Sequence, residues 1–214
     1  MLDKSGALTW LVTELGALLL VPGEHLLAWE GSDPPSAGRK VEAKFRSGAP
    51  NDPATDYDRA CDVEDFLGLI EVGTGKGLVL GGDPEMMTAW LPAGPPGDED
   101  SLAPGGMLVR WSYAESEEEV LRLLDEVPDS VWKAEDFVFE VGPAPLYLFG
   151  SAVPGNDLRL AEYLVAEYLM IHLPPGRYSV ATALYKPNES TALVLHKLDR
   201  LTPDPGDAPN QVLQ

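Results

Sequence analysis

Short runs of apolar, β-branched and aromatic residues recur along the chain, and most are bounded by glycine, proline or asparagine. Runs of this kind are typical of β-strands. Because many short strands alternate with turns, the pattern predicts a mainly β (α+β) fold whose antiparallel sheets pack face to face as a sandwich. The predicted strands are 16–21, 67–72, 77–80, 107–113, 137–141, 146–149, 168–173, 178–184 and 192–198.

One segment has helical spacing instead. Ser116 occupies an N-cap position and Glu119 follows three residues later, as in a capping box. The acidic first turn suits the positive end of a helix dipole, and Pro128 ends the pattern. The sequence therefore predicts one clear helix over about 116–127, with apolar positions at Val120, Leu123, Leu124 and Val127. Weaker helical segments are expected at 62–66 and 156–163.

Proline and glycine concentrate in three polar segments, 31–55, 92–106 and 154–157, which we expect to be loops between strands. The last residues, 202–214, have no periodicity and are predicted to be a disordered tail. Residues 1–201 are then expected to form a single β-rich domain.

Some of the strand-like runs resemble one another. The stretches 16–29 and 75–90 each contain an apolar run and a turn and end in Ala-Trp, and 140–154 opens like 71–84. The similarity is compatible with two related halves, 62–128 and 129–201, preceded by an added N-terminal hairpin. It is equally compatible with chance likeness between short apolar strands.

The charge narrows the possible partners. The chain has 35 acidic and 15 basic residues, a formal net charge of −20, which disfavours nucleic acid and anionic membranes and favours a basic partner. The alternative is that the acidity only aids solubility or reflects an acidic proteome. A single cysteine, no signal-peptide pattern and no apolar run near membrane length lead us to expect a soluble cytoplasmic protein.

The sequence offers no recognisable catalytic chemistry. The segment 73–77 resembles a phosphate loop, but no Ser or Thr follows Lys76. His25, His172 and His196 have no partners at metal-ligand spacing, and carboxylates near Cys61 should raise the pKa of its thiol. We therefore predict no enzyme activity, no metal site and no cofactor.

Several motifs together resemble the immunity protein 21 family of bacterial polymorphic toxin systems. They are DYDRAC at 56–61, the segment 72–90, LVRW at 108–111 and PPGRY at 174–178, and the resemblance covers roughly 10–201. The segment 31–55 looks like decoration peculiar to this chain. The family-motif residues, which we expect to be structural, are Trp29, Tyr57, Arg59, Cys61, Trp90, Trp111, Gly176 and Tyr178.

The resemblance implies a cytoplasmic immunity protein, or antitoxin, that binds a cognate toxin and neutralises it by stoichiometric inhibition. A basic toxin would be met by an acidic face, for which the candidate partner-binding residues are Asp83, Glu85, Asp98, Glu99, Asp100, Glu115 and Glu118. These residues could instead be solvated loop and helix-cap charges. The second hypothesis is an acidic binding or scaffold module with no toxin partner. The third is a hydrolase that uses carboxylates.

Overall fold

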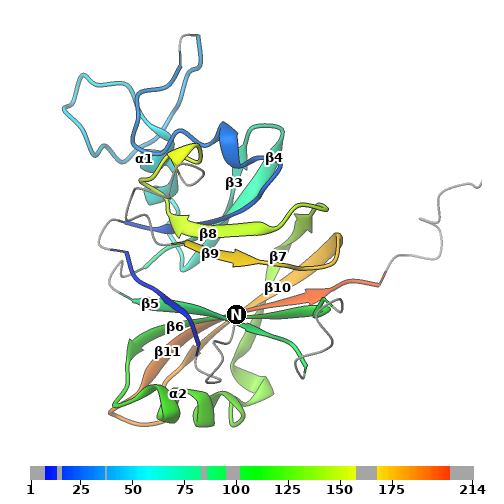
Figure 1. Ribbon diagram of the computed structural model, residues 1–214. Helices are drawn as coiled ribbons and strands as arrows, with labels where there is room; N and C mark the ends of the chain where they lie inside the picture. The colour runs from blue at the N-terminus through cyan, green and yellow to red at the C-terminus, as the bar shows by residue number, and fades with distance from the viewer. Residues whose placement is uncertain are drawn as a thin grey trace, which may run out of the picture.

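The computed structural model describes residues 8–13, 16–36, 38–82, 86–94, 102–157 and 168–202. Within them the chain forms two antiparallel sheets, two α-helices and two short 3-10 helices (Figure 1). The six-stranded sheet has the order β1 (Trp10–Leu11), β5 (Met87–Pro92), β6 (Gly105–Tyr113), β11 (Ala192–Arg200), β10 (Gly176–Tyr185), β7 (Trp132–Val141). The five-stranded sheet has the order β3 (Leu67–Val72), β4 (Gly75–Leu80), β2 (Leu18–Pro22), β8 (Leu146–Gly150), β9 (Tyr168–Ile171). The helices are η1 (Leu26–Ala28), α1 (Asp56–Cys61), α2 (Glu117–Leu124) and η2 (Asp129–Val131).

The two sheets pack face to face around one apolar core. Leu20 and Leu148 of the five-stranded sheet lie in the same buried cluster as Leu108, Phe139 and Tyr178 of the six-stranded sheet. This arrangement confirms the predicted mainly β, sandwich-like fold. Both outer faces are also covered, so the molecule has four layers (Figure 1).

The central strand of the five-stranded sheet, β2, is buried on both faces. Leu18 and Leu20 face the core between the sheets, whereas Leu19 and Val21 face a second cluster that contains Leu26, Trp29 and Ala60. Because side chains alternate along a strand, a run without polar residues is the pattern expected for a strand covered on both sides. The segment containing η1 and α1 therefore forms the layer over this sheet.

Helix α2 covers the outer face of the six-stranded sheet through Val120 and Leu123, as the helical spacing predicted. The Ser116 hydroxyl accepts a hydrogen bond from the Glu119 amide at 3.2 Å. The Glu119 carboxylate does not complete the predicted capping box, because it accepts from the Glu115 amide and the Thr191 hydroxyl. The helix ends at Leu124, three residues before the predicted end.

Three elements differ from the sequence expectations. The structure adds the strands β1 and β5, and the short helix predicted at 62–66 lies earlier, at Asp56–Cys61. In the glycine-rich segment 73–77, residues 73–74 form a β-hairpin turn and residues 75–77 begin β4, since Val72 pairs with Gly75 and Gly73 has a left-handed φ of +60°. The predicted helix at 156–163 lies mostly outside the described residues, as does the tail beyond 202.

Strands from both proposed halves enter both sheets. In the first half β3 and β4 join the five-stranded sheet and β5 and β6 the six-stranded sheet, whereas in the second half β8 and β9 join the five-stranded sheet and β7, β10 and β11 the six-stranded sheet. A duplication of 62–128 in 129–201 stays a prediction, as do the domain limits.

Candidate functional site

The segment 56–61, which the sequence marks as part of a family motif, forms helix α1. The Thr55 hydroxyl accepts a hydrogen bond from the Asp58 amide at 3.2 Å, and the Asp58 carboxylate accepts from the Thr55 amide at 2.8 Å. This reciprocal capping box satisfies two amides at the start of a helix of only six residues. The capping box therefore fixes where the motif becomes helical.

Asp58 also holds the preceding loop. Its Oδ1 accepts hydrogen bonds from the Ser47 amide at 2.8 Å and from the Ser47 hydroxyl at 2.7 Å, and the residue is 1% exposed. Burial by itself would raise the pKa of Asp58, but the hydrogen bonds from Ser47 and Thr55 outweigh it and lower the pKa below its usual value. The carboxylate is therefore held in its charged form.

Asp62, which caps the C-terminal end of α1, binds the same loop at a second point. Its two carboxylate oxygens accept from the amides of Lys44 at 2.5 Å and Phe45 at 2.6 Å. A carboxylate that receives two successive main-chain amides fixes the loop backbone at that place. The tip of the loop is thereby tied to the helix.

Asp56 is the third anchor, and its side chain is fully buried. It accepts hydrogen bonds from Arg39 Nη2 at 2.5 Å, from Arg59 Nη2 at 2.5 Å and Nε at 3.1 Å, and from the Glu30 amide at 3.0 Å. Burial opposes ionisation, but the Arg39, Glu30 and Arg59 contacts together lower the pKa of Asp56. Two guanidinium groups therefore surround one buried carboxylate.

Arg59 links this group to the five-stranded sheet. Its Nη1 donates to the carbonyl of Glu71 in β3 at 3.1 Å, and its guanidinium carbon lies 5.6 Å from the ring centre of Trp29. The Trp29 indole is buried and donates to the carbonyl of Ser151 at 2.9 Å. Arg59 and Trp29 thus join α1, β3 and the turn after β8.

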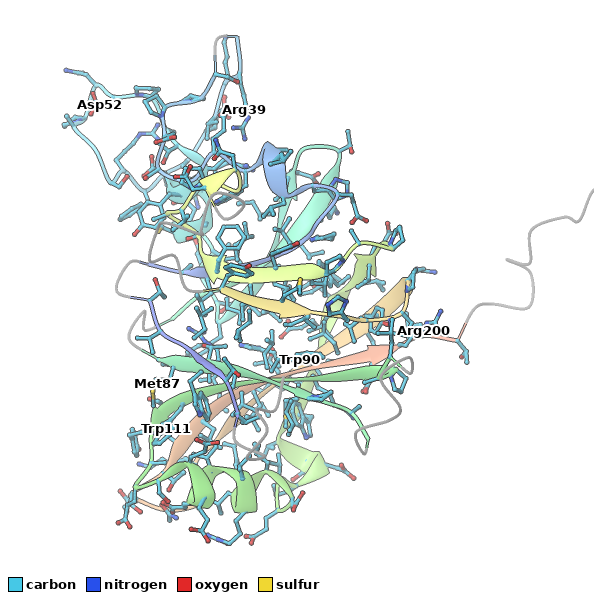
Figure 2. The ribbon with its side chains drawn as sticks, in the orientation of Figure 1. Arg39, Asp52, Met87, Trp90, Trp111 and Arg200 are labelled. Atoms are coloured by element: carbon cyan, nitrogen blue, oxygen red, sulfur yellow. The ribbon has the colours of Figure 1, made fainter. Side chains whose placement is uncertain are left out.

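The segment 38–48, which we call the anchored loop, projects beyond the five-stranded sheet at the end of the molecule opposite α2 (Figures 1 and 2). Sequence reasoning treated the surrounding segment 31–55 as decoration. The structure instead shows one unit. Asp56 and Asp58 within α1 hold Arg39 and Ser47, and the C-cap residue Asp62 holds Lys44–Phe45. Alternating acidic residues in the motif were the only sequence signal of this arrangement.

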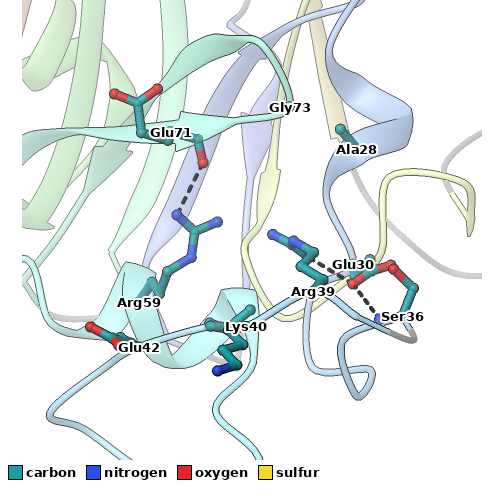
Figure 3. A pocket seen from close by; sticks show the side chains of 10 residues that line it. Ala28, Glu30, Ser36, Arg39, Lys40, Glu42, Arg59, Glu71 and Gly73 are labelled. Carbon is teal, nitrogen blue, oxygen red and sulfur yellow. Dashed lines mark hydrogen bonds and ion pairs between the residues drawn. The ribbon is translucent and has the colours of Figure 1, made fainter.

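A pocket of about 480 Å³ lies between the anchored loop and the sandwich (Figure 3). The loop contributes Arg39 and Lys40, α1 contributes Arg59, and the β3–β4 hairpin contributes Glu71. Arg39 is further fixed by Glu30, at 2.6 Å. The remaining lining residues are Ala28, Ser36, Val41, Glu42 and Gly73. The pocket is therefore polar and carries both charges, with guanidinium groups already positioned.

Tyr57 and Cys61, both partly buried, lie on α1 near this unit. Burial, the largest cause in both cases, raises the pKa of Tyr57 to about 12. It also raises the pKa of the Cys61 thiol. The ring of Tyr57 meets Phe45 edge to face at 6.4 Å. The Tyr57 ring also packs directly over the backbone of Gly16, whose φ is +66°. A Cβ added at Gly16 would lie only 2.5 Å from the Tyr57 side chain.

The other family-motif residues lie in the sandwich, away from the anchored loop. Trp90 is buried between the sheets, and Trp111 meets Trp10 edge to face at 5.4 Å on the side of α2 (Figure 2). Tyr178 is fully buried, and its hydroxyl donates to the carbonyl of Pro174 at 2.7 Å. Gly176 begins β10 with a φ of +155°.

Only two of the seven residues of the predicted acidic face can be placed. Glu115 and Glu118 are exposed at the start of α2, where neighbouring Glu117 accepts from the Leu8 amide at 2.8 Å. The other five lie outside the described residues: Asp83, Glu85, Asp98, Glu99 and Asp100. A single acidic face made by all seven stays a prediction.

Among the described residues, no cluster of His, Cys, Asp and Glu side chains could hold a metal ion. No helix in that part of the chain is both long and apolar enough to span a membrane. His196 is fully buried in β11, and burial together with the charge of Arg110 lowers its pKa to about 3. It is thus a neutral residue of the sheet that hydrogen-bonds with Thr182 at 3.1 Å.

Comparison with known proteins gives one match. A family model described as Immunity protein 21 matches residues 9–191, which include every described strand except β11 and contain the motif at 56–61. The chain belongs to the immunity protein 21 family. Neither the curated proteins nor the solved structures contain a match.

Membership of the immunity protein 21 family confirms the resemblance drawn from the motifs and supports an immunity role for the chain. Families of this kind imply a toxin as partner and are in general not enzymes. The matched region contains α1 and all of the segment 31–55, so the family match extends over the anchored loop.

Proposed function

We propose that this protein is an antitoxin that binds one cognate bacterial toxin domain and neutralises it by stoichiometric inhibition in the cytoplasm. The family supplies the immunity role. The observation that carries the binding mechanism is the anchored loop, a polar surface segment that three carboxylates hold in one conformation.

The energetics of the loop favour a role in recognition. No described residue from 38 to 53 is buried, so this segment gains little from the hydrophobic core. Ordering a backbone costs about 1–2 kcal/mol per residue, whereas a hydrogen bond to a charged group contributes about 1.5–3 kcal/mol. Several such bonds therefore hold in one conformation a surface segment that contributes little to the core. A preformed binding surface of this kind loses less entropy when a partner binds.

The charge supports a protein partner over a nucleic acid. A net charge of −20 repels phosphate backbones and accelerates encounter with a basic protein. The exposed carboxylates Glu115 and Glu118 at the start of α2 are one candidate contact for such a toxin. On this proposal inhibition occurs by occlusion of the toxin, with no chemical step.

The test is co-expression with the product of the neighbouring toxin reading frame. We expect the two proteins to co-purify in a 1:1 complex, and cells that express the toxin to survive only when this protein is also made. Absence of both the complex and the rescue would refute the proposal and favour the alternative of an acidic scaffold module without a toxin partner.

A further inference from the structure

We propose that the anchored loop is the surface that contacts the toxin, and that it takes an acidic element of the toxin together with an apolar recess. This inference rests on the proposed function, because it names the chemistry of that partner. It places the contact at the end of the molecule opposite α2.

The loop has the opposite charge character to the rest of the chain. Residues 38–48 contain four basic residues, Arg39, Lys40, Lys44 and Arg46, and one acidic residue, Glu42, in a protein whose net charge is −20. Four of the 15 Lys and Arg residues of the chain thus fall in one short segment. A positive surface patch favours an acidic patch on the partner, because complementary charges across an interface attract.

Three of these four cations are exposed to solvent. Lys40, Lys44 and Arg46 are exposed, and the only ion pair recorded among them in the described part of the chain joins Lys44 to Glu64 at 3.4 Å. Both side chains of that pair are more than four-fifths exposed, so the pair contributes little and a partner carboxylate can replace it.

Phe45 gives the loop an apolar contact. Its side chain is 42% exposed between Lys44 and Arg46, while its amide is fixed by Asp62 and its ring rests against Tyr57. Aromatic and arginine side chains are the residue types most enriched at the energetic centres of protein interfaces. A rigidly mounted Phe flanked by cations therefore fits an apolar recess with an acidic rim.

The neighbouring pocket offers a place for one carboxylate of the partner. Lys40 lines it together with the guanidinium groups of Arg39 and Arg59, which Asp56 and Glu30 hold in position (Figure 3). A guanidinium has five N–H donors, and the contacts described use two of those on Arg39. Since the guanidinium groups of Arg39 and Arg59 are already fixed, these two side chains lose little entropy when an anion binds.

Nucleic acid fits this surface less well than protein. Glu30, Glu42 and Glu71 line the same pocket, so a run of phosphates would meet carboxylates as well as cations. A protein can place single carboxylates opposite the cations and avoid these acidic groups. The pattern of mixed charges therefore favours a folded partner.

The experiment measures association of a catalytically inactive form of the neighbouring toxin with wild type, the loop variant Lys44→Glu/Arg46→Glu, and the matched control Lys133→Glu/Lys186→Glu, which makes the same charge change at the six-stranded sheet. All four substituted residues are exposed, and circular dichroism verifies that each variant is folded. We expect the loop variant to bind about tenfold more weakly or worse, mainly through slower association at low salt, and the control to bind within about threefold of wild type. Phe45→Ala should weaken binding to a similar degree through faster dissociation.

The outcomes separate the two proposals. If the wild type does not bind the toxin, the proposed function fails. If the wild type binds and both loop variants bind equally well, or if the control variant loses as much binding as the loop variant, the function stands and the loop assignment is wrong. Binding of a short single-stranded oligonucleotide by the wild type, lost in the loop variant and competing with the toxin, would overturn the assignment of a protein partner.

Discussion

Replacement of Asp56 by alanine should both destabilise the protein and release the anchored loop. The side chain is fully buried and accepts four hydrogen bonds, three from Arg39 and Arg59 and one from the Glu30 amide. The substitution removes these bonds and leaves two guanidinium groups without their shared carboxylate.

The expected loss is about 3 kcal/mol. Breaking a buried ion pair by removing one partner costs about 3–5 kcal/mol when the remaining charge stays buried. Here the side chains of Arg39 and Arg59 are 31% and 19% exposed, so both can recover part of their hydration, and the estimate lies at the lower end of that range. For a chain of 214 residues this loss corresponds to a decrease in Tm of roughly 6–12 °C.

The assay is urea denaturation followed by tryptophan fluorescence, because Trp29 lies directly beneath Arg59 and reports on this site. Limited trypsin digestion supplies a second measurement, since Lys40, Lys44 and Arg46 become cleavable when the loop is released. Asp33→Ala is the matched control, because Asp33 is an exposed aspartate in the segment 31–55 that precedes α1. Equal stability and equal tryptic cleavage of the two variants would refute the role assigned to Asp56.

Three further predictions follow from the contacts described above. The lowered pKa values of Asp56 and Asp58 mean that their ionised forms stabilise the fold above the unfolded carboxyl pKa of about 3.9. This stabilisation is lost as the pH falls through the lower pKa values of the folded state. When both residues are replaced by Asn, the Tm measured in a pH series should therefore decrease less steeply in acid. Tyr178→Phe removes the bond to Pro174 and should cost about 1 kcal/mol in urea denaturation, and an unchanged midpoint would contradict this. Because burial raises the pKa of Cys61, iodoacetamide should alkylate it at pH 7 more slowly than free cysteine, and a rate equal to that of free cysteine would show an accessible thiolate instead.

The sequence predicted those elements whose side-chain pattern is local. Alternating or continuous apolar runs gave the positions of nine strands, and the Ser116 cap with its helical spacing gave α2. It missed β5, whose run Met-Thr-Ala-Trp-Leu-Pro has few β-branched residues and is held by pairing with β6. It also misplaced the short helix, which was predicted at 62–66 and lies at Asp56–Cys61, because a six-residue polar helix has too little apolar periodicity to fix its position.

The candidate site could not be predicted, because it depends on contacts between residues that no local pattern connects. Arg39 meets Asp56 across 17 positions and Phe45 meets Asp62 across 17. Sequence spacing shows only that the motif is acidic, whereas the fold determines which loop its carboxylates hold. The same limit applies to Glu119, whose carboxylate was expected to cap its own helix but binds Thr191 in the neighbouring chain segment.

The position of β2 has a consequence for synthesis on the ribosome. Its five residues form the middle of a sheet between β4 and β8, and Leu18 pairs with Gly150. At about 5–20 residues per second, translation takes several seconds to reach β8 after β2 has been made. During that interval an apolar strand lacks one of its two neighbours, so the five-stranded sheet can be completed only when most of the chain has emerged.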